Sequence, residues 1–228
     1  MSGPHIAPAL FTFLRQLKRN NNRAWFQEHK KRYESDVRDP LLRFIAEFRP
    51  HLHKISLHYV ADARPMGGSL FRIYRDTRFS RDKSPYKTVA AVQFRHEKGK
   101  DVHAPGFYLH LEPGNVFAGV GLWHPSGDPL RMVRDAIAEH PDRWNKVLRK
   151  RTFRDRYELA GELLKRPPRG YDPKHPMIED LKRKDFIAVT QFDEKQACSS
   201  AFLKEYVAAT RAATPFMEFL TRAVGLPW

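Results

Sequence analysis

The sequence predicts an α+β fold, a single domain in which an antiparallel sheet of about five strands packs against N- and C-terminal helices. Apolar residues recur at helical spacing near both ends of the chain and alternate in the middle. Hydrophobic residues make up 41% of the 228 residues, which is enough to bury a core. The length is typical of one large domain.

The N-terminal part, residues 8–55, is predicted to hold three helices, at residues 8–18, 23–37 and 41–54. Apolar residues in each helix recur every three or four positions, so each helix has one buried stripe. Asn20-Asn21-Asn22 separates the first two helices, because asparagine tolerates the conformation that ends a helix and also caps the next one. Asp39-Pro40 begins the third helix with a cap and a proline.

The middle of the chain, residues 58–123, is predicted to form the sheet, with strands at residues 70–77, 88–96, 107–112 and 115–122. These segments are rich in β-branched and aromatic residues, and Pro113-Gly114 is a turn pair between the last two. Alternation implies one buried and one open face. We expect the open face to carry Arg72, Tyr74, Asp76, Gln93, Arg95, Tyr108, His110 and Glu112.

The C-terminal part, residues 128–228, is predicted to be mainly helical. Asp128-Pro129 starts one helix, Pro141 restarts it, and residues 201–224 form a long apolar helical pattern interrupted near Pro215. Residues 186–192 have the pattern of one further strand. A proline-rich loop at residues 165–176 ends near His175, and it either forms one wall of a pocket or simply reverses the chain.

The net charge of +15 is concentrated in two segments of the chain. Residues 64–100 and residues 143–169 each contribute +7. Like charges repel one another in the folded state, so clustered cations indicate an anionic partner, and nucleic acid is one such partner. The alternative interpretation is a basic surface that only keeps the protein in solution.

The densest candidate site is the segment at residues 72–87, where cations outnumber carboxylates. Arginine binds phosphate or carboxylate with paired hydrogen bonds, so unpaired cations would favour an anionic ligand. Arg75 follows apolar residues on a face expected to be buried, and Asp76 or Asp82 could neutralise it. The predicted anion-binding residues are Arg72, Arg75, Arg78, Ser80, Lys83, Ser84, Tyr86 and Lys87. The alternative is a structural network that locks a hairpin loop.

A second hypothesis makes the same region an enzyme site, with Asp76, Asp82 or His110 in acid–base or metal roles. A magnesium-assisted phosphodiester reaction would use His110 and Glu112 together with Asp76. The chain lacks a Gly-x-x-x-x-Gly-Lys loop, which excludes P-loop nucleotide hydrolysis. A third hypothesis is a structural or partner-binding module. The sequence identifies no cofactor, no set of metal ligands and no oligomeric state.

The cysteine content and the hydropathy of the sequence indicate where in the cell the protein is expected to be. Cys198 is the only cysteine, so an internal disulfide framework is excluded, and no apolar run is long enough for a membrane span. The first residues lack a signal-peptide pattern, because Arg15 and Lys18 follow the apolar stretch. We therefore expect a cytoplasmic protein with no membrane partner that folds without a disulfide or a structural metal.

Four motifs resemble those of one known family. They are Arg75-Asp-x-Arg-Phe-Ser-x-Asp-Lys-Ser-Pro-Tyr-Lys87, Phe13-Leu14-x-x-Leu17-x-x-x-Asn21-Asn22-x-x-Trp25-Phe26, Gly119-x-Gly121-x-Trp123-x-Pro125, and Leu164-Lys-x-x-Pro168-x-Gly170-Tyr171 followed by His175-Pro176. Together they extend over most of the chain, which resembles the mainly bacterial family of conserved hypothetical proteins known as domain of unknown function 2461. The resemblance implies a shared folding unit. It implies no activity and no catalytic residue.

Overall fold

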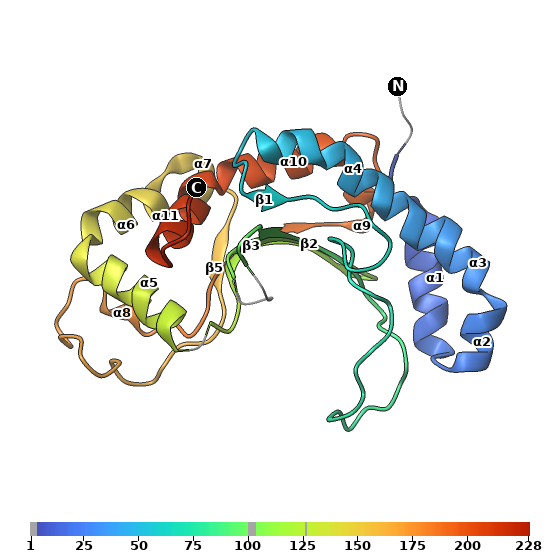
Figure 1. Cartoon of the computed structure of the whole chain (residues 1–228), viewed down its shortest axis with the longest axis horizontal. Coiled ribbons are helices and arrows are strands. Elements are labelled where there is room, and N and C mark those ends of the chain that lie inside the picture. Colours follow the sequence, from blue (N-terminus) through green and yellow to red (C-terminus); the bar gives the residue numbers. More distant parts are fainter. Residues whose placement is uncertain (1–3, 100–103, 126) are drawn as a thin grey trace.

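A computed structural model of the chain describes residues 4–99, 104–125 and 127–228. The fold is α+β with an antiparallel sheet, as predicted, and within these ranges the sheet has six strands in the order β1-β2-β3-β4-β6-β5. Helices lie over one face of the sheet and beside its two ends, and the opposite face is concave (Figure 1). The strands are β1 Tyr59–Val60, β2 Ala90–His96, β3 Gly106–Glu112, β4 Asn115–Leu122, β5 Glu158–Ala160 and β6 Phe186–Phe192.

The helices fall into one group before the central strands and one group after them. The first group is α1 Pro8–Arg19, α2 Arg23–Glu28, α3 Lys30–Tyr33, a π-helical turn Glu34–Arg38 and α4 Asp39–His53. The second group is α5 Asp128–Glu139, α6 Pro141–Arg149, α7 Arg151–Arg154, α8 Ile178–Leu181, α9 Glu194–Ala197, α10 Phe202–Ala212 and α11 Thr214–Ala223. None of the helices in the described ranges combines the length and hydropathy needed to cross a bilayer.

The predicted helix at residues 23–37 is divided into three pieces. The boundary between α2 and α3 falls at His29, whose backbone leaves the helical region, whereas the backbone stays helical from α3 into the π-helical turn. The His29 ring stacks on Trp25 with 4.1 Å between centroids, and its Nδ1 atom lies 2.8 Å from the Trp25 carbonyl oxygen. The Trp25 carbonyl oxygen also accepts from the His29 backbone N–H at 3.0 Å, so the backbone hydrogen bond is kept where the helix changes direction.

The core lies between the covered face of the sheet and the helices above it. Phe48 of α4 packs against Phe94 of β2 with 4.7 Å between ring centroids and against Tyr206 of α10 with 5.0 Å. On β3, Phe107, Leu109 and Leu111 are fully buried, and the three residues that alternate with them are only partly buried. The predicted alternation of β3 is confirmed.

β6 lies very close to β4 at Gly121. Gly121 has a φ of +119°, and a Cβ atom at this position would lie 2.0 Å from the carbonyl oxygen of Phe186 on β6. Only glycine fits such an approach. The predicted strand at residues 186–192 is confirmed, and β5, which the sequence pattern does not predict, is an edge strand of the described sheet that pairs with β6.

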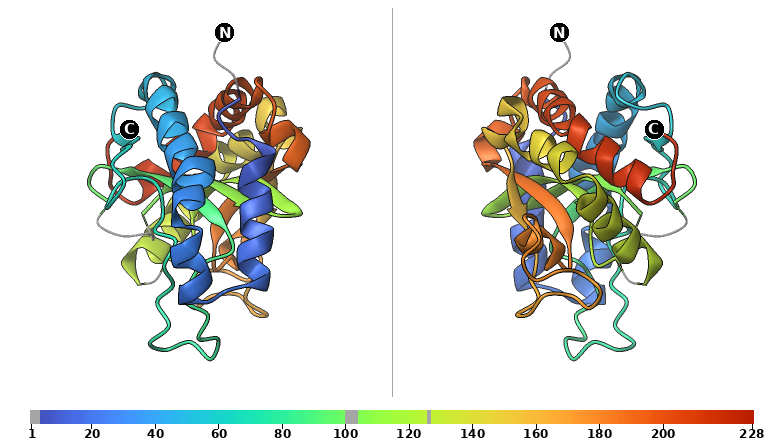
Figure 2. Two further views of the ribbon diagram at one scale, coloured as in Figure 1. Left: turned by 90° about the vertical axis from the view of Figure 1, so that its right-hand side faces the viewer. Right: turned by 90° about the vertical axis from the view of Figure 1, so that its left-hand side faces the viewer.

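The predicted strand at residues 70–77 is wrong. Among the described residues the segment forms two isolated bridges, one from Leu70 to Val92 of β2 and one from Tyr74 to Tyr86 on the return arm of the loop. Pro85 has no N–H to donate, so a regular ladder cannot continue along this arm. The two arms instead leave the sheet and form a long loop beside it (Figure 2). Arg72, Tyr74 and Asp76 therefore do not lie on the open face of the sheet.

Candidate functional site

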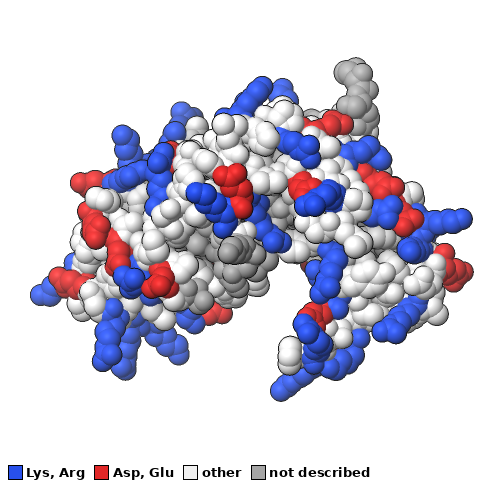
Figure 3. Space-filling view, viewed as in Figure 1, with Lys and Arg blue, Asp and Glu red and all other residues white. Residues whose placement is uncertain are grey.

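The open face of the sheet holds a cavity of about 520 Å³. Four strands form its floor, with Gln93 from β2, Tyr108 and His110 from β3, Phe117 from β4, and Val189 from β6. We call this face, together with the loops at residues 72–87 and 165–176 on either side, the concave face. In Figure 3, Lys and Arg side chains gather on both lobes that flank the hollow. The volume is within the range of roughly 300–1,000 Å³ typical of ligand pockets.

Two cations lie against the aromatic ring of Phe71 at the edge of the cavity. The Lys87 Nζ atom is 5.2 Å and the Arg95 guanidinium carbon 5.8 Å from the centroid of that ring. Burial lowers the pKa of Lys87, and the nearby Arg72 lowers it further. In the part of the chain that the structure describes, neither Lys87 nor Arg72 makes an ion pair with a carboxylate. The cavity edge is therefore positively charged.

Three polar side chains of β3 contact one another on the open face of the sheet, namely Tyr108, His110 and Glu112. The Tyr108 hydroxyl lies 3.0 Å from His110 Nδ1, and His110 Nε2 lies 3.4 Å from a Glu112 carboxylate oxygen. Burial lowers the pKa of His110, and the hydrogen bond to Glu112 opposes this shift. The neutral ring then donates from Nε2 to Glu112 and accepts at Nδ1 from Tyr108. Burial also raises the pKa of Tyr108 to about 12.

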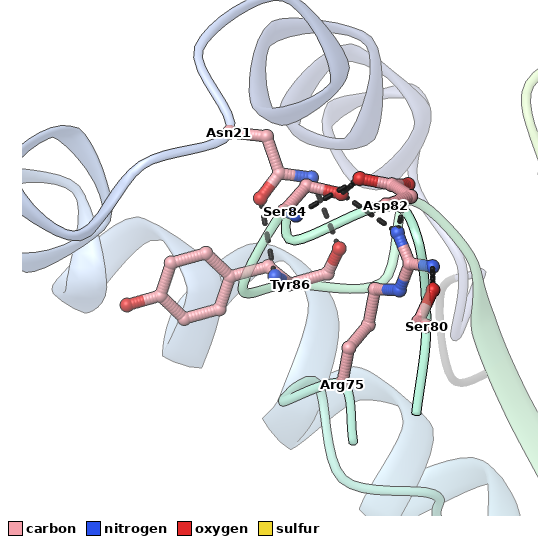
Figure 4. Close-up of polar contacts among 6 residues, drawn as sticks. All are labelled: Asn21, Arg75, Ser80, Asp82, Ser84 and Tyr86. Atoms are coloured by element: carbon pink, nitrogen blue, oxygen red, sulfur yellow. Dashed lines mark hydrogen bonds and ion pairs between the residues drawn. The ribbon is translucent and has the colours of Figure 1, made fainter. Parts of the chain in front are cut away.

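Arg75 belongs to a network inside the loop (Figure 4). It donates to Asp82, to the Ser84 hydroxyl at 2.7 Å and, at 3.5 Å, to the Ser80 hydroxyl. Asp82 also accepts from the Ser84 backbone N–H at 2.9 Å. Hydrogen bonds from Ser84 and then Arg75 hold the pKa of Asp82 well below its usual range. The expected pairing of Arg75 with Asp82 is confirmed, and these four side chains are occupied by one another.

A second pair lies farther out on the loop. Arg78 donates to Asp76 at 2.7 Å, and hydrogen bonds from Arg78 lower the pKa of Asp76 to about 2. Lys83 donates to the Thr77 carbonyl at 2.9 Å. Asp76 therefore does not join His110 and Glu112. Over the described ranges, no three His, Cys, Asp or Glu side chains are grouped so that they could hold a metal ion.

Tyr86 does not offer its ring to a ligand. The side chain is only 2% exposed, and its ring stacks on Phe26 of α2 with 4.0 Å between centroids. The backbone of Tyr86 also bonds to the side chain of Asn21, as Figure 4 shows. Tyr86 thus anchors the return arm of the loop beside Lys87.

The proline-rich loop forms the other side of the concave face. It carries four exposed cations, and within the described residues none of them is in an ion pair. They are Lys165, Arg166, Arg169 and Lys174. His175 bonds to the Ala138 carbonyl at 3.2 Å and to the Met177 N–H at 3.1 Å. This histidine holds the chain reversal in place, which agrees with the simpler of the two expectations for the loop.

Several cavity residues were not anticipated from the sequence. Gln93, Arg95, Tyr108 and His110 were expected on the open face and lie there. The apolar residues of β4 and β6 that complete the floor were missed. The period of two in β4 is the available signal, because Phe117, Gly119 and Gly121 alternate along the strand with the apolar residues Val116, Ala118 and Val120. The sequence pattern places Phe71 on the buried face of a strand, so it does not predict this residue at the cavity.

Comparison with known sequences supports the resemblance of the four motifs. A family model described as a conserved hypothetical protein, domain of unknown function 2461, matches residues 9–219. No curated protein matches the sequence. The match extends over nearly the whole chain, so it includes the cavity, the loop at residues 72–87 and the proline-rich loop. The chain therefore belongs to the family of conserved hypothetical proteins known as domain of unknown function 2461.

Proposed function

We propose that the concave face binds a phosphate-bearing ligand, with Lys87 as the central contact. The observation that carries this proposal is a partly buried lysine at the cavity edge with no carboxylate partner in the described residues. A cation held away from water is unfavourable unless an opposite charge compensates for it. A phosphate group would supply that charge, and two further cations add to the positive potential there, since Arg72 acts on the Lys87 charge and Arg95 lies against the same Phe71 ring.

Positive charge on both sides of the hollow (Figure 3) indicates a ligand that is larger than a single phosphate group. The loop at residues 72–87 and the proline-rich loop both present cations, and the hollow separates them (Figure 3). A polyanion lying across the concave face would neutralise charges on both sides. Nucleic acid is such a polyanion, and neutralising its phosphates releases bound counterions, which makes binding dependent on salt.

The residues of the loop are assigned different roles in this proposal. Lys87 and Arg72 contact the ligand directly, and the exposed Arg81 at the outer turn adds charge. Arg75 keeps the loop folded through Asp82 and acts on binding only indirectly. Arg78 and Lys83 are already partly satisfied within the loop, so we expect smaller contributions from them.

A titration against salt tests the proposal. Fluorescence polarisation with a labelled oligonucleotide, between about 50 and 200 mM salt, should give a linear fall of log affinity with log salt. Lys87→Ala should reduce the slope by about 1, as should Arg72→Ala. Arg211→Ala, an exposed position on α10 across the sheet from the cavity, is the matched control and should leave the slope unchanged. Absence of binding at the lowest salt would refute the proposal.

The contacts along β3 favour a second candidate function, acid–base chemistry at the same cavity. His110 is neutral at neutral pH and bonds to both Tyr108 and Glu112, an arrangement that can accept and pass on a proton. Phosphodiester cleavage that His110→Ala abolishes would support an enzyme. If the protein shows neither binding nor cleavage, the structural or partner-binding module becomes the better interpretation.

A further inference from the structure

Gly119 lies in the floor of the cavity, and its backbone conformation does not require a glycine. It lies opposite Tyr108 across the β3–β4 hairpin. A Cβ atom at this position would be 3.6 Å from ring atoms of both Phe117 and Tyr108, which is ordinary van der Waals contact, and φ is not positive. Gly121 differs, because its conformation and its contact with Phe186 exclude a side chain. The consequence of glycine at position 119 is a recess between aromatic and aliphatic walls.

The walls of this recess suit a flat ring. Phe117 stacks on His110 with 4.5 Å between centroids, and the Tyr108 ring is 5.8 Å from Phe117. Ile187 and Val189 line the side formed by β6. Aromatic side chains on an open sheet are typical stacking surfaces for nucleobases, because every base has a π face.

Gln93 supplies a polar group at the edge of the recess. Its side-chain oxygen accepts from Arg95 Nε at 3.1 Å, which orients the amide. Its Nε2 atom lies over Gly106, 3.2 Å from where a Cβ atom of that residue would be. Among the described residues this NH2 group has no hydrogen-bond partner. This donor lines the cavity from β2, where Gln93 pairs with Tyr108, the residue that faces Gly119 on the next strand, and it matches the ring nitrogen and carbonyl acceptors of a base.

We propose that the recess over Gly119 takes a nucleobase, while the phosphate attached to the same nucleotide lies on Lys87. This inference rests on the proposed function and specifies its ligand as a nucleoside phosphate, either free or within a single strand. Charge complementarity with Lys87, Arg72 and Arg95 favours the phosphate, and the Gln93 donor favours the base. An acyl chain in the same recess would leave the Gln93 donor against hydrocarbon, which is unfavourable.

Filling the recess tests the inference. Gly119→Leu places a side chain where the base would stack, and Gly119→Ala, which adds one methyl group, is the graded control. Val189→Phe fills the recess from β6 and replaces Gly119→Leu if that variant fails to fold, as judged by thermal melting. Each protein is titrated with a thymidine strand of about ten nucleotides, with inorganic polyphosphate of similar charge, and with adenosine monophosphate.

The three probes separate the base from the phosphate. We expect Gly119→Leu to weaken binding of the thymidine strand about tenfold, which is the loss of one stacked base, and to change polyphosphate affinity less than about twofold. If Gly119→Leu weakens binding of adenosine monophosphate as well as of the strand, free nucleotides are ligands. If it weakens binding of the strand but not of adenosine monophosphate, the ligand is a single strand. Either result supports a base in the recess.

Two results would overturn the inference. Equal binding of the thymidine strand by wild type, Gly119→Leu and Val189→Phe would show that no base enters the recess, while the proposed phosphate site would stand. Equal losses for polyphosphate and the strand would show that the variants disturb the phosphate site and not a base. If neither polyphosphate nor the strand binds the wild-type protein, the proposed function fails and the inference fails with it.

Discussion

The side-chain amide of Asn21 bonds to both backbone polar groups of Tyr86, although the two residues are 65 positions apart in the chain. Asn21 Nδ2 donates to the Tyr86 carbonyl oxygen at 3.0 Å, and Asn21 Oδ1 accepts from the Tyr86 N–H at 3.1 Å. The return arm of the loop is thereby fastened to the turn between α1 and α2. Lys87 follows directly, so this tie also sets where the cation lies at the cavity edge.

Loss of the Asn21 tie should destabilise the protein. Asn21→Asp keeps an acceptor but leaves the Tyr86 carbonyl without its donor, and Asn21→Ala removes both bonds. We expect each to lower the free energy of unfolding by about 1–2 kcal/mol in urea titrations. Asn20→Ala is the control, because the exposed Asn20 side chain bonds within its own helix end, to the Gln16 carbonyl. Equal losses for Asn20→Ala and Asn21→Ala would contradict the assigned role.

Arg75 and Asp82 should show energetic coupling in a double-mutant cycle. The Arg75 side chain is 28% exposed and that of Asp82 is 61% exposed, so solvent screens part of the attraction. We expect a small but measurable favourable coupling between Arg75→Ala and Asp82→Ala. The more exposed pair of Arg78 and Asp76 is the control and should couple less. Stronger coupling in the outer pair would argue against Arg75 as the centre of the network.

Anion binding should weaken at alkaline pH because of Lys87. Burial and Arg72 lower the pKa of this lysine below its ordinary value of 10.5, and only the charged form binds phosphate. Affinity for the oligonucleotide should therefore fall as pH rises through the lowered pKa, before lysines elsewhere titrate. Lys87→Arg keeps its charge throughout this range, so its affinity should hold. The same alkaline fall in wild type and Lys87→Arg would assign the effect to other groups.

The loop should loosen in acid. Hydrogen bonds from Arg78 lower the pKa of Asp76 to about 2, and those from Ser84 and Arg75 lower the pKa of Asp82 further. A depressed carboxyl pKa stabilises the folded loop above the unfolded value of about 3.9, and this stabilisation is lost as pH falls through the folded value. Amide exchange in residues 75–84, corrected for the intrinsic pH dependence, should lose protection between about pH 4 and pH 2. Uniform loss across the sheet would indicate global unfolding instead.

Thermal stability should depend neither on reductant nor on chelator. Cys198 is the only cysteine, and the helices pack on the sheet through an extensive apolar core. Melting curves with and without dithiothreitol and with and without EDTA should coincide. A midpoint lower by several degrees in EDTA would reveal a structural metal and contradict this expectation.

The sequence pattern predicts local elements well and long-range pairing less well. On β3, the alternation of Leu109 with His110 predicts the buried and open faces, since neighbours along a strand always point to opposite sides. A similar composition at residues 70–77 predicts a strand that does not form, because a strand also needs a regular partner and Pro85 interrupts the opposite arm. The three-residue strand β5 has too short a pattern to detect and depends on its pairing with β6.

The asparagines at residues 20–22 show the same division. Asn22 caps α2 by accepting from the Trp25 N–H at 3.0 Å, as its position predicts. Asn21 has a partner in a distant loop, which no local pattern indicates. The cavity is similar, because its floor combines β2, β3, β4 and β6, whose order in the sheet follows from tertiary packing.

By itself the sequence determined the main helices, the central hairpin, the open and covered faces of the sheet and the concentration of positive charge in two segments. These features depend on residue types and on spacing within a few positions. Only the tertiary structure decided which cations remain available. Arg75 and Lys87 are equally charged in the sequence, but Asp82 neutralises Arg75, while Lys87 lies beside a cavity with no carboxylate partner in the described residues. The physical reason is that ion pairing depends on where the folded chain places carboxylates, and a cation's sequence neighbours do not determine that.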